Sequence, residues 1–198
     1  MTVTADQVRQ LREQTGAGMM ECKKALQEAA GDLETAVDLL RKAGVARATQ
    51  RGGRTASEGL VDAYIHPGSR VGVLIEVNCE TDFVARTPEF AVLVRNLAMQ
   101  VAAGGAEYVR REDVPADRVA REREIYAAQL EGQRKPPAIV EKIVAGKLDK
   151  FFAEVCLLEQ PYIRDDQHTV GALMADAASK TGENLIVRRF VRFRLGQE

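Results

Sequence analysis

The spacing of apolar residues changes near Gly59, and no other feature constrains the fold as strongly. Before residue 44, apolar residues recur every three or four positions, which is the spacing of one face of an α-helix. In the run VGVLIEVN, residues 71–78, they occupy every second position, which is the spacing of one face of a β-strand. Because the chain passes from a purely helical pattern to a mixed one, we expect an α+β fold.

The first 44 residues contain the start and stop signals of three short helices. Thr4 can cap the first helix, and Gly16 can end it. The second is expected to begin near Met19. Asp32 can cap a third, which Gly44 would end. Three helices of this length form a very small bundle, so we expect residues 1–44 to be a module that gains stability from a tether or a partner.

Residues 45–58 are rich first in alanine and then in glycine, which predicts a linker that is helical early and loose late. Arg47, Arg51 and Arg54 lie around a Gly-Gly pair, as in RNA-binding segments rich in arginine and glycine. A single copy of this pattern is weak, and a solvated linker is the interpretation that we favour.

Residues 59–198 are expected to form a larger domain. The segments LVDAYIH and RVGVLIEV, separated by Pro-Gly-Ser, predict a hairpin. Helices are expected to begin near residues 88, 115 and 136, after Gly146 and after Thr169, and a strand is expected at 185–195. This order favours a mainly antiparallel sheet packed by helices. In the last strand, arginines stand beside phenylalanines over 188–194, which suits base stacking but equally a half-solvated sheet face, and we favour the latter.

The charge balance argues against a nucleic acid or a membrane as the partner of the whole chain. Among 198 residues, 28 Lys and Arg stand against 29 Asp and Glu, and the formal net charge is -1. No apolar run approaches the roughly 20 residues that span a bilayer. The amino-terminal residues also lack the apolar region of a signal peptide, so we expect a cytoplasmic protein.

No local pattern predicts catalysis, a cofactor or a metal site. Cys22, Cys79 and Cys156 fit no zinc-binding spacing, so we expect buried free thiols. His66 and His168 are about 100 residues apart in the sequence. We therefore expect a protein that is not an enzyme.

The connection CETDFVAR, residues 79–86, fits neither the strand before it nor the helix after it. It can hold one helical turn capped by Thr81 or Asp82. Phe83 then has two possible positions: packed back onto Val77 or Phe90, or displayed to solvent. A displayed phenylalanine forgoes about 1.5–3 kcal/mol of burial and is usually destined for the pocket of a partner.

Three stretches resemble the elongation factor Ts family: LREQTGAGMMECKKAL from residue 11, EVNCETDFVAR from residue 76 and ENLIVRRFVRFRLG from residue 183. The likeness covers about residues 5–196. It implies a guanine-nucleotide exchange factor that binds elongation factor Tu and promotes release of GDP, so that GTP can bind. It also implies that residues 1–44 resemble a ubiquitin-associated fold, and that residues 59–198 serve dimerisation and GTPase binding.

The resemblance also assigns roles to residues. Asp82 and Phe83 would intrude near the Mg²⁺ of the GTPase, while Thr81 and Val84 would hold the turn. Docking of the small module would involve Arg12, Gly16, Ala17, Gly18, Met19 and Met20. The short length of this chain resembles that of family members that work as homodimers. Such short members can carry a cysteine that bridges the two subunits, but this chain has Val191 at that position. A homodimer of this chain would therefore rest on packing alone.

Two other functions remain open at this stage. A helper of ribosomes or RNA would use the arginines of 47–54 and 188–194, and its binding would weaken steeply with salt. A ubiquitin-associated-type adaptor would function through residues 1–44 alone.

Overall fold

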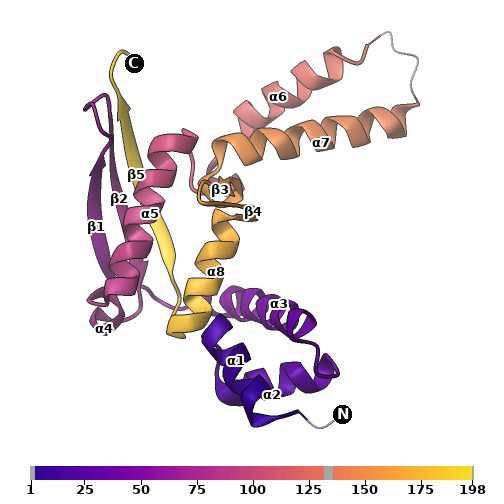
Figure 1. Ribbon diagram of the computed structural model, residues 1–198. Helices are drawn as coiled ribbons and strands as arrows, with labels where there is room; N and C mark the ends of the chain where they lie inside the picture. The colour runs from indigo at the N-terminus through magenta and orange to yellow at the C-terminus, as the bar shows by residue number, and fades with distance from the viewer. Residues whose placement is uncertain (1–2, 132–135, 198) are drawn as a thin grey trace. The chain divides into compact units, whose positions relative to one another are not determined.

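The computed structural model describes residues 3–131 and 136–197, with the backbone alone for residues 45–51. The chain divides into two compact units, each built from segments that are distant in the sequence (Figure 1). The first unit comprises Met1–Gly59, Asn78–Thr87 and Ala172–Ile186; the second comprises Leu60–Val77, Pro88–Gly171 and Val187–Glu198. Helices and a three-stranded antiparallel sheet together confirm the predicted α+β class.

The first unit begins with three helices, α1 (Ala5–Thr15), α2 (Met19–Glu28) and α3 (Leu33–Arg51). The predicted caps are present: Thr4 Oγ1 accepts from Gln7 N at 3.3 Å, and Asp32 Oδ1 accepts from Thr35 N at 2.8 Å. Apolar side chains from all three helices form a small core, with these residues buried: Val8, Leu11, Cys22, Ala25, Leu26, Ala29 and Ala36. The capped ends and the shared core confirm a three-helix bundle at the amino terminus.

The expected end of the third helix at Gly44 is wrong, because α3 continues to Arg51. A methyl group at Gly44 would lie 3.4 Å from Ser179 Oγ of α8, the helix Val170–Thr181. Gly44 therefore serves close packing between two helices rather than helix termination. The side chains of Arg47 and Arg51 lie outside the described part of the chain.

The second unit contains most of the sheet, with strand order β1-β2-β5. The strands are β1 (Glu58–Ile65), β2 (Val71–Cys79) and β5 (Ile186–Arg194). A tight turn joins β1 to β2, and Leu195 N donates to Arg70 O at 2.9 Å, which sets the end of β5 beside the start of β2. All three strands therefore run antiparallel to their neighbours.

Helix α5 (Pro88–Gly104) covers one face of this sheet (Figure 1). Its Arg95 Nη1 donates to Ala63 O of β1 at 2.6 Å, and its Ala102 O accepts from Arg192 Nε of β5 at 3.3 Å. The alternating residues of β2 that the sequence assigned to one face are buried (Val73, Ile75, Val77) or half-buried (Val71). Within the described part of this unit, the opposite face of the sheet carries no helix (Figure 1).

The rest of the second unit is helical apart from a short strand pair. Two longer helices are α6 (Ala116–Ala128) and α7 (Pro137–Val155), and two short 3₁₀ turns are η1 (Arg111–Asp113) and η2 (Leu157–Glu159). Strands β3 (Pro161–Tyr162) and β4 (Asp165–Thr169) pair in antiparallel fashion. The predicted helix break at Gly146 is wrong, because the burial of Val144, Leu148 and Phe151 outweighs the roughly 1 kcal/mol that a glycine costs inside a helix.

A buried amide pair joins α5 to the segment after η2. Gln100 Nε2 donates to Gln160 Oε1 and to Pro161 O, both at 3.1 Å, and Gln100 Oε1 accepts from Ile163 N at 2.9 Å. Gln160 Nε2 donates in turn to backbone oxygens of α5 and α7.

Among the described residues, no helix is both long and apolar enough to cross a membrane.

Candidate partner-binding site

The connection after β2 holds a single helical turn, α4 (Asp82–Ala85), at whose exposed edge Phe83 lies. Thr81 caps the turn, and its Oγ1 accepts from Val84 N at 3.4 Å. The side chain of Phe83 is 82% exposed, so it is not packed onto Val77 or Phe90. The structure thus supports the displayed position of the ring and excludes the buried one.

The neighbours of Phe83 fix the turn and give it a charged edge. Ala85 is buried and anchors α4, while Val84 is half-buried. Asp82 Oδ2 pairs with Arg86 Nη2 at 3.0 Å, and the side chain of Arg86 is largely exposed. Cys79, fully buried below the turn, donates its thiol hydrogen to Thr81 O at 3.1 Å, and burial raises the pKa of this thiol.

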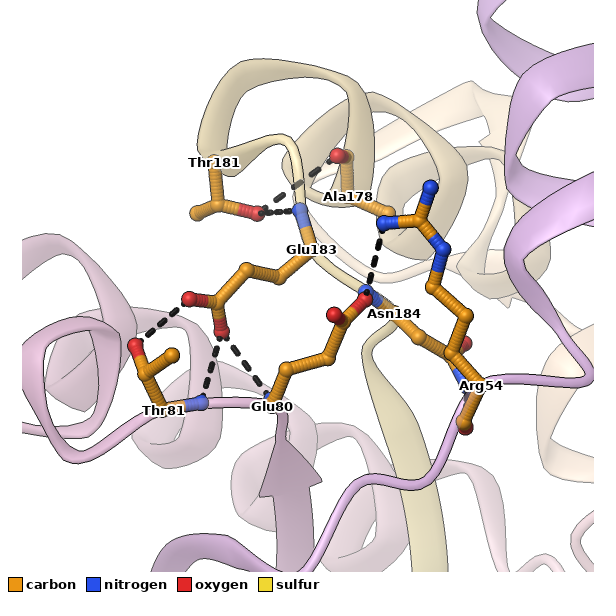
Figure 2. A network of polar contacts seen from close by, with 7 residues as sticks. All are labelled: Arg54, Glu80, Thr81, Ala178, Thr181, Glu183 and Asn184. Carbon is orange, nitrogen blue, oxygen red and sulfur yellow. Dashed lines mark hydrogen bonds and ion pairs between the residues drawn. The ribbon is translucent and has the colours of Figure 1, made fainter.

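A polar network connects the start of the turn with the end of α8 (Figure 2). The carboxylate of Glu183 accepts hydrogen bonds from the backbone of Glu80 and from the backbone and hydroxyl of Thr81. Glu80 Oε1 accepts from Asn184 N at 2.6 Å and pairs with Arg54 Nη1 at 3.5 Å. Apart from Thr81, sequence reasoning gave these residues no role at the site, because partners more than 100 positions apart leave no local pattern.

The second group of predicted residues lies in the loop between α1 and α2. Gly16 has φ +67°, in the left-handed region, and ends α1 by donating from its N to Arg12 O at 2.8 Å. Gly18 N donates to Glu21 Oε2 at 3.3 Å and so begins α2. Cys22, fully buried, donates to Ala17 O at 3.7 Å. The loop is therefore held in place from both of its ends.

This loop displays two methionines. Met19 is 61% exposed and Met20 is 75% exposed, although both belong to the first turn of a helix whose other face is buried. Both predicted groups belong to the first compact unit. Both also border the end of α8, where the stem of Lys180 approaches Gly16 and Glu183 binds the turn.

Several arginines considered for RNA binding are already bonded within the protein. Arg54 pairs with Glu80, and Arg189 Nε pairs with Glu76 Oε2 at 2.7 Å. Arg192 donates to a carbonyl of α5. Each of these three guanidinium groups therefore has at least one partner within the protein.

The described residues include no group of three or more His, Cys, Asp or Glu side chains placed to hold a metal ion. What the site presents is an exposed ring and two exposed methionines, all on short segments anchored by buried neighbours. Aromatic and methionine side chains of this kind are the ones enriched in protein interfaces. The fold and the site are therefore those of an α+β protein with exposed side chains suited to contact with another protein.

Comparison with known proteins identifies the family. The model of the family described as Elongation factor TS matches residues 3–197. The elongation factor Ts of Moorella thermoacetica is 59% identical over 195 residues, covering 98% of this chain and 96% of that protein. The elongation factor Ts of Carboxydothermus hydrogenoformans is 56% identical over 195 residues, covering 98% of this chain and 90% of that one. The chain belongs to the elongation factor Ts family of translation elongation factors.

Proposed function

We propose that this protein is a cytoplasmic guanine-nucleotide exchange factor that binds elongation factor Tu, both GDP-bound and nucleotide-free, and promotes GDP release. The observation that supports this most directly is the 82% exposure of Phe83 on a capped and anchored turn. A ring held in solvent forgoes burial within its own chain and can regain it only in a pocket of another molecule. Membership of the elongation factor Ts family supports elongation factor Tu as that molecule.

The exchange needs no covalent step, only differential binding. A factor that shifts nucleotide affinity by about 10⁴ must contribute about 5.5 kcal/mol of differential binding. Burial of one phenylalanine supplies at most about 3 kcal/mol. Phe83 would wedge into an apolar pocket and Asp82 would disturb the shell of the Mg²⁺, while Thr81 and Val84 keep the turn in shape. The rest of the binding must come from other surfaces.

The three-helix module is our candidate for much of that remainder. We assign docking on the nucleotide-binding domain of the GTPase to the loop between α1 and α2 and to its neighbour Arg12, with residues 1–44 as the module, 45–58 as its linker and 59–198 as the larger domain. The docking residues are Arg12, Gly16, Ala17, Gly18, Met19 and Met20. The exposure of both methionines supports this assignment. Because coupling is reciprocal, bound nucleotide must weaken binding of the factor as much as the factor weakens binding of nucleotide.

The test is release of a fluorescent GDP analogue from elongation factor Tu, measured by stopped flow with and without this protein. We expect acceleration by the parent chain and loss of most of it in Phe83→Ala. The matched control is Ile139→Ala, which removes another exposed apolar side chain, 44% exposed on α7. A parent chain without effect would refute the proposed function, whereas a fully active Phe83→Ala variant would refute only the role of the ring.

We further propose that two copies of the chain associate through the uncovered face of the sheet. This face, opposite α5, presents exposed apolar side chains from all three strands and from the residue after β5: Val61, Ile65, Leu74, Val191, Phe193 and Leu195. An open groove runs between the β1–β2 turn and the end of β5, lined by residues that include Ile65, Leu74 and Phe193. A two-fold axis would bring this face of one copy against the same face of the other, which is the arrangement of an isologous dimer.

Light scattering coupled to gel filtration tests this association. We expect the parent to elute as a dimer and Phe193→Glu as a monomer, since the charge would be buried without a partner. Val92→Glu is the control, because Val92 is also exposed but belongs to α5. A monomeric parent, or a dimer that survives Phe193→Glu, would contradict the sheet-face dimer without touching the exchange activity.

A further inference from the structure

We propose that Glu183 is a positioning residue for nucleotide exchange, which holds the turn that carries Phe83 in the orientation that inserts. This inference rests on the exchange function proposed above and adds a residue to it. Glu183 lies after the end of α8, 100 positions beyond Phe83 in the sequence, and it does not belong to the exposed surface of the turn.

The carboxylate of Glu183 accepts three hydrogen bonds at the point where α4 begins. Its Oε2 accepts from Glu80 N at 3.0 Å and from Thr81 N at 3.1 Å, and its Oε1 accepts from Thr81 Oγ1 at 2.5 Å. The same hydroxyl oxygen accepts from Val84 N and so caps the turn. Glu183 therefore fixes the capping residue itself, and Phe83 follows that residue by two positions.

The contact is reciprocal, because Glu80 binds back to the segment that carries Glu183. Glu80 Oε1 accepts from Asn184 N at 2.6 Å, and the buried Asn184 donates from Nδ2 to Arg54 O at 2.8 Å. Arg54 Nη1, at 3.5 Å from Glu80 Oε1, offsets part of the repulsion between the two carboxylates. We call the contact between Glu80–Thr81 and Glu183–Asn184 the reciprocal clasp (Figure 2).

The backbone of the supporting segment is shaped for this contact. Thr181 Oγ1 accepts from Glu183 N at 3.4 Å and donates to Ala177 O at 3.0 Å. Gly182, at φ +76°, turns the chain directly after α8. Both features direct the side chain of Glu183 away from the helix and toward the start of α4, as Figure 2 shows.

A turn as short as α4 depends on such external bonds. It has four residues, and a single helical turn is unstable by itself, because fixing its backbone costs more than its one or two hydrogen bonds return. Without the clasp, the orientation that inserts would be populated for only part of the time. A fall of that population to about one tenth would lower productive insertion about tenfold. The docking loop is held by separate bonds and would still bind.

The experiment measures GDP release from elongation factor Tu over a range of concentrations of the full-length factor. For Glu183→Ala we expect a maximal release rate lowered about tenfold or more, with a half-saturating concentration changed by less than about threefold. Glu183→Gln keeps an oxygen for the two amide donors, and we expect it to restore the rate to within about threefold of the parent. The control is Glu76→Ala, which removes a carboxylate of β2 whose ion pair with Arg189 does not involve the turn.

A double-mutant cycle with Phe83→Ala separates positioning from a general loss of structure. If Glu183 acts through the ring, its replacement costs little more once the ring is gone, so the two effects are not additive. Equal loss on both backgrounds would overturn the proposal, as would a Glu183→Ala variant with the parental rate. A parent chain that does not accelerate release at all would instead overturn the underlying exchange function.

A measurement without the GTPase tests the clasp directly. Amide hydrogen exchange at Glu80 and Thr81 is expected to rise at least about tenfold in Glu183→Ala, while amides of the buried strand β2, such as that of Ile75, remain protected. Unchanged protection at both amides would show that Glu183 does not hold the turn. A general loss of protection that includes Ile75 would show that Glu183 supports the whole fold, which also contradicts a positioning role.

Discussion

Replacing glycine by alanine is expected to have opposite effects at two positions of this chain. Gly16 ends α1 with φ +67°, a region that costs an alanine about 1–2 kcal/mol. A methyl group there would also lie 3.3 Å from Lys180 Cγ, and the shift of that flexible stem adds about 0.5 kcal/mol. We therefore expect Gly16→Ala to lower the free energy of unfolding by about 1.5–2.5 kcal/mol.

Gly146 provides the comparison, because it lies inside α7 with no atom within 4 Å of where a methyl group would be. Alanine favours a helix interior over glycine by about 0.8–1 kcal/mol, so Gly146→Ala is expected to raise the free energy of unfolding. Urea unfolding followed by circular dichroism measures both variants on the same parent chain.

Removal of the lysine stem distinguishes backbone strain from crowding at Gly16. In a Lys180→Ala background, Gly16→Ala is expected to keep most of its cost, since strain at φ +67° does not depend on the neighbour. Full relief by Lys180→Ala would show that crowding is the cause and that the left-handed backbone is not. A neutral Gly16→Ala variant would refute the structural account of the docking loop.

Gln100→Leu would remove the partner of three polar atoms, which are Gln160 Oε1, Pro161 O and Ile163 N. We expect urea unfolding to show a free energy of unfolding lowered by about 2–4 kcal/mol. Burial raises the pKa of Cys156 to about 11, so at pH 8 only about 0.1% is thiolate, and labelling by a disulfide reagent should wait for unfolding. The hydrogen bond from Arg118 lowers the pKa of Glu107 below its ordinary 4.5. The stability that this ion pair contributes is present above pH 4.5 and is lost as pH falls through the lowered pKa of Glu107. On acidification below pH 4.5, the free energy of unfolding should therefore fall less in Glu107→Gln than in the parent.

Local signals in the sequence predicted much of the fold. Thr4, Gly16 and Asp32 mark helix ends because capping needs only the residues next to it, and each was found at a helix end. The alternation in β2 was equally reliable, because one buried face of a sheet imposes a period of two. The cap of α4 at Thr81 follows from the same kind of local chemistry.

The errors arose where packing overrides a local preference. Gly44 and Gly146 were read as helix ends, yet each lies inside a helix, the first because Ser179 packs closely and the second because the helix buries enough apolar surface on either side. The reciprocal clasp could not be predicted at all. Its halves lie 103 positions apart, and a glutamate after a glycine has no distinguishing local environment.

The reciprocal clasp, by fixing α4, also affects how much binding free energy each part of the factor must contribute. Ordering a mobile side chain and loop on binding costs about 0.5–1.5 kcal/mol per side chain, and a turn that is already fixed avoids much of that cost. More of the roughly 3 kcal/mol available from burying Phe83 then remains to displace the nucleotide. That amount corresponds to about 100-fold in affinity, so a shift of about 10⁴ still requires a further 100-fold from other contacts. Because Met19 and Met20 lie on a loop fixed by separate bonds, their contribution should persist when the clasp is broken, and loss of the clasp should slow release without preventing docking.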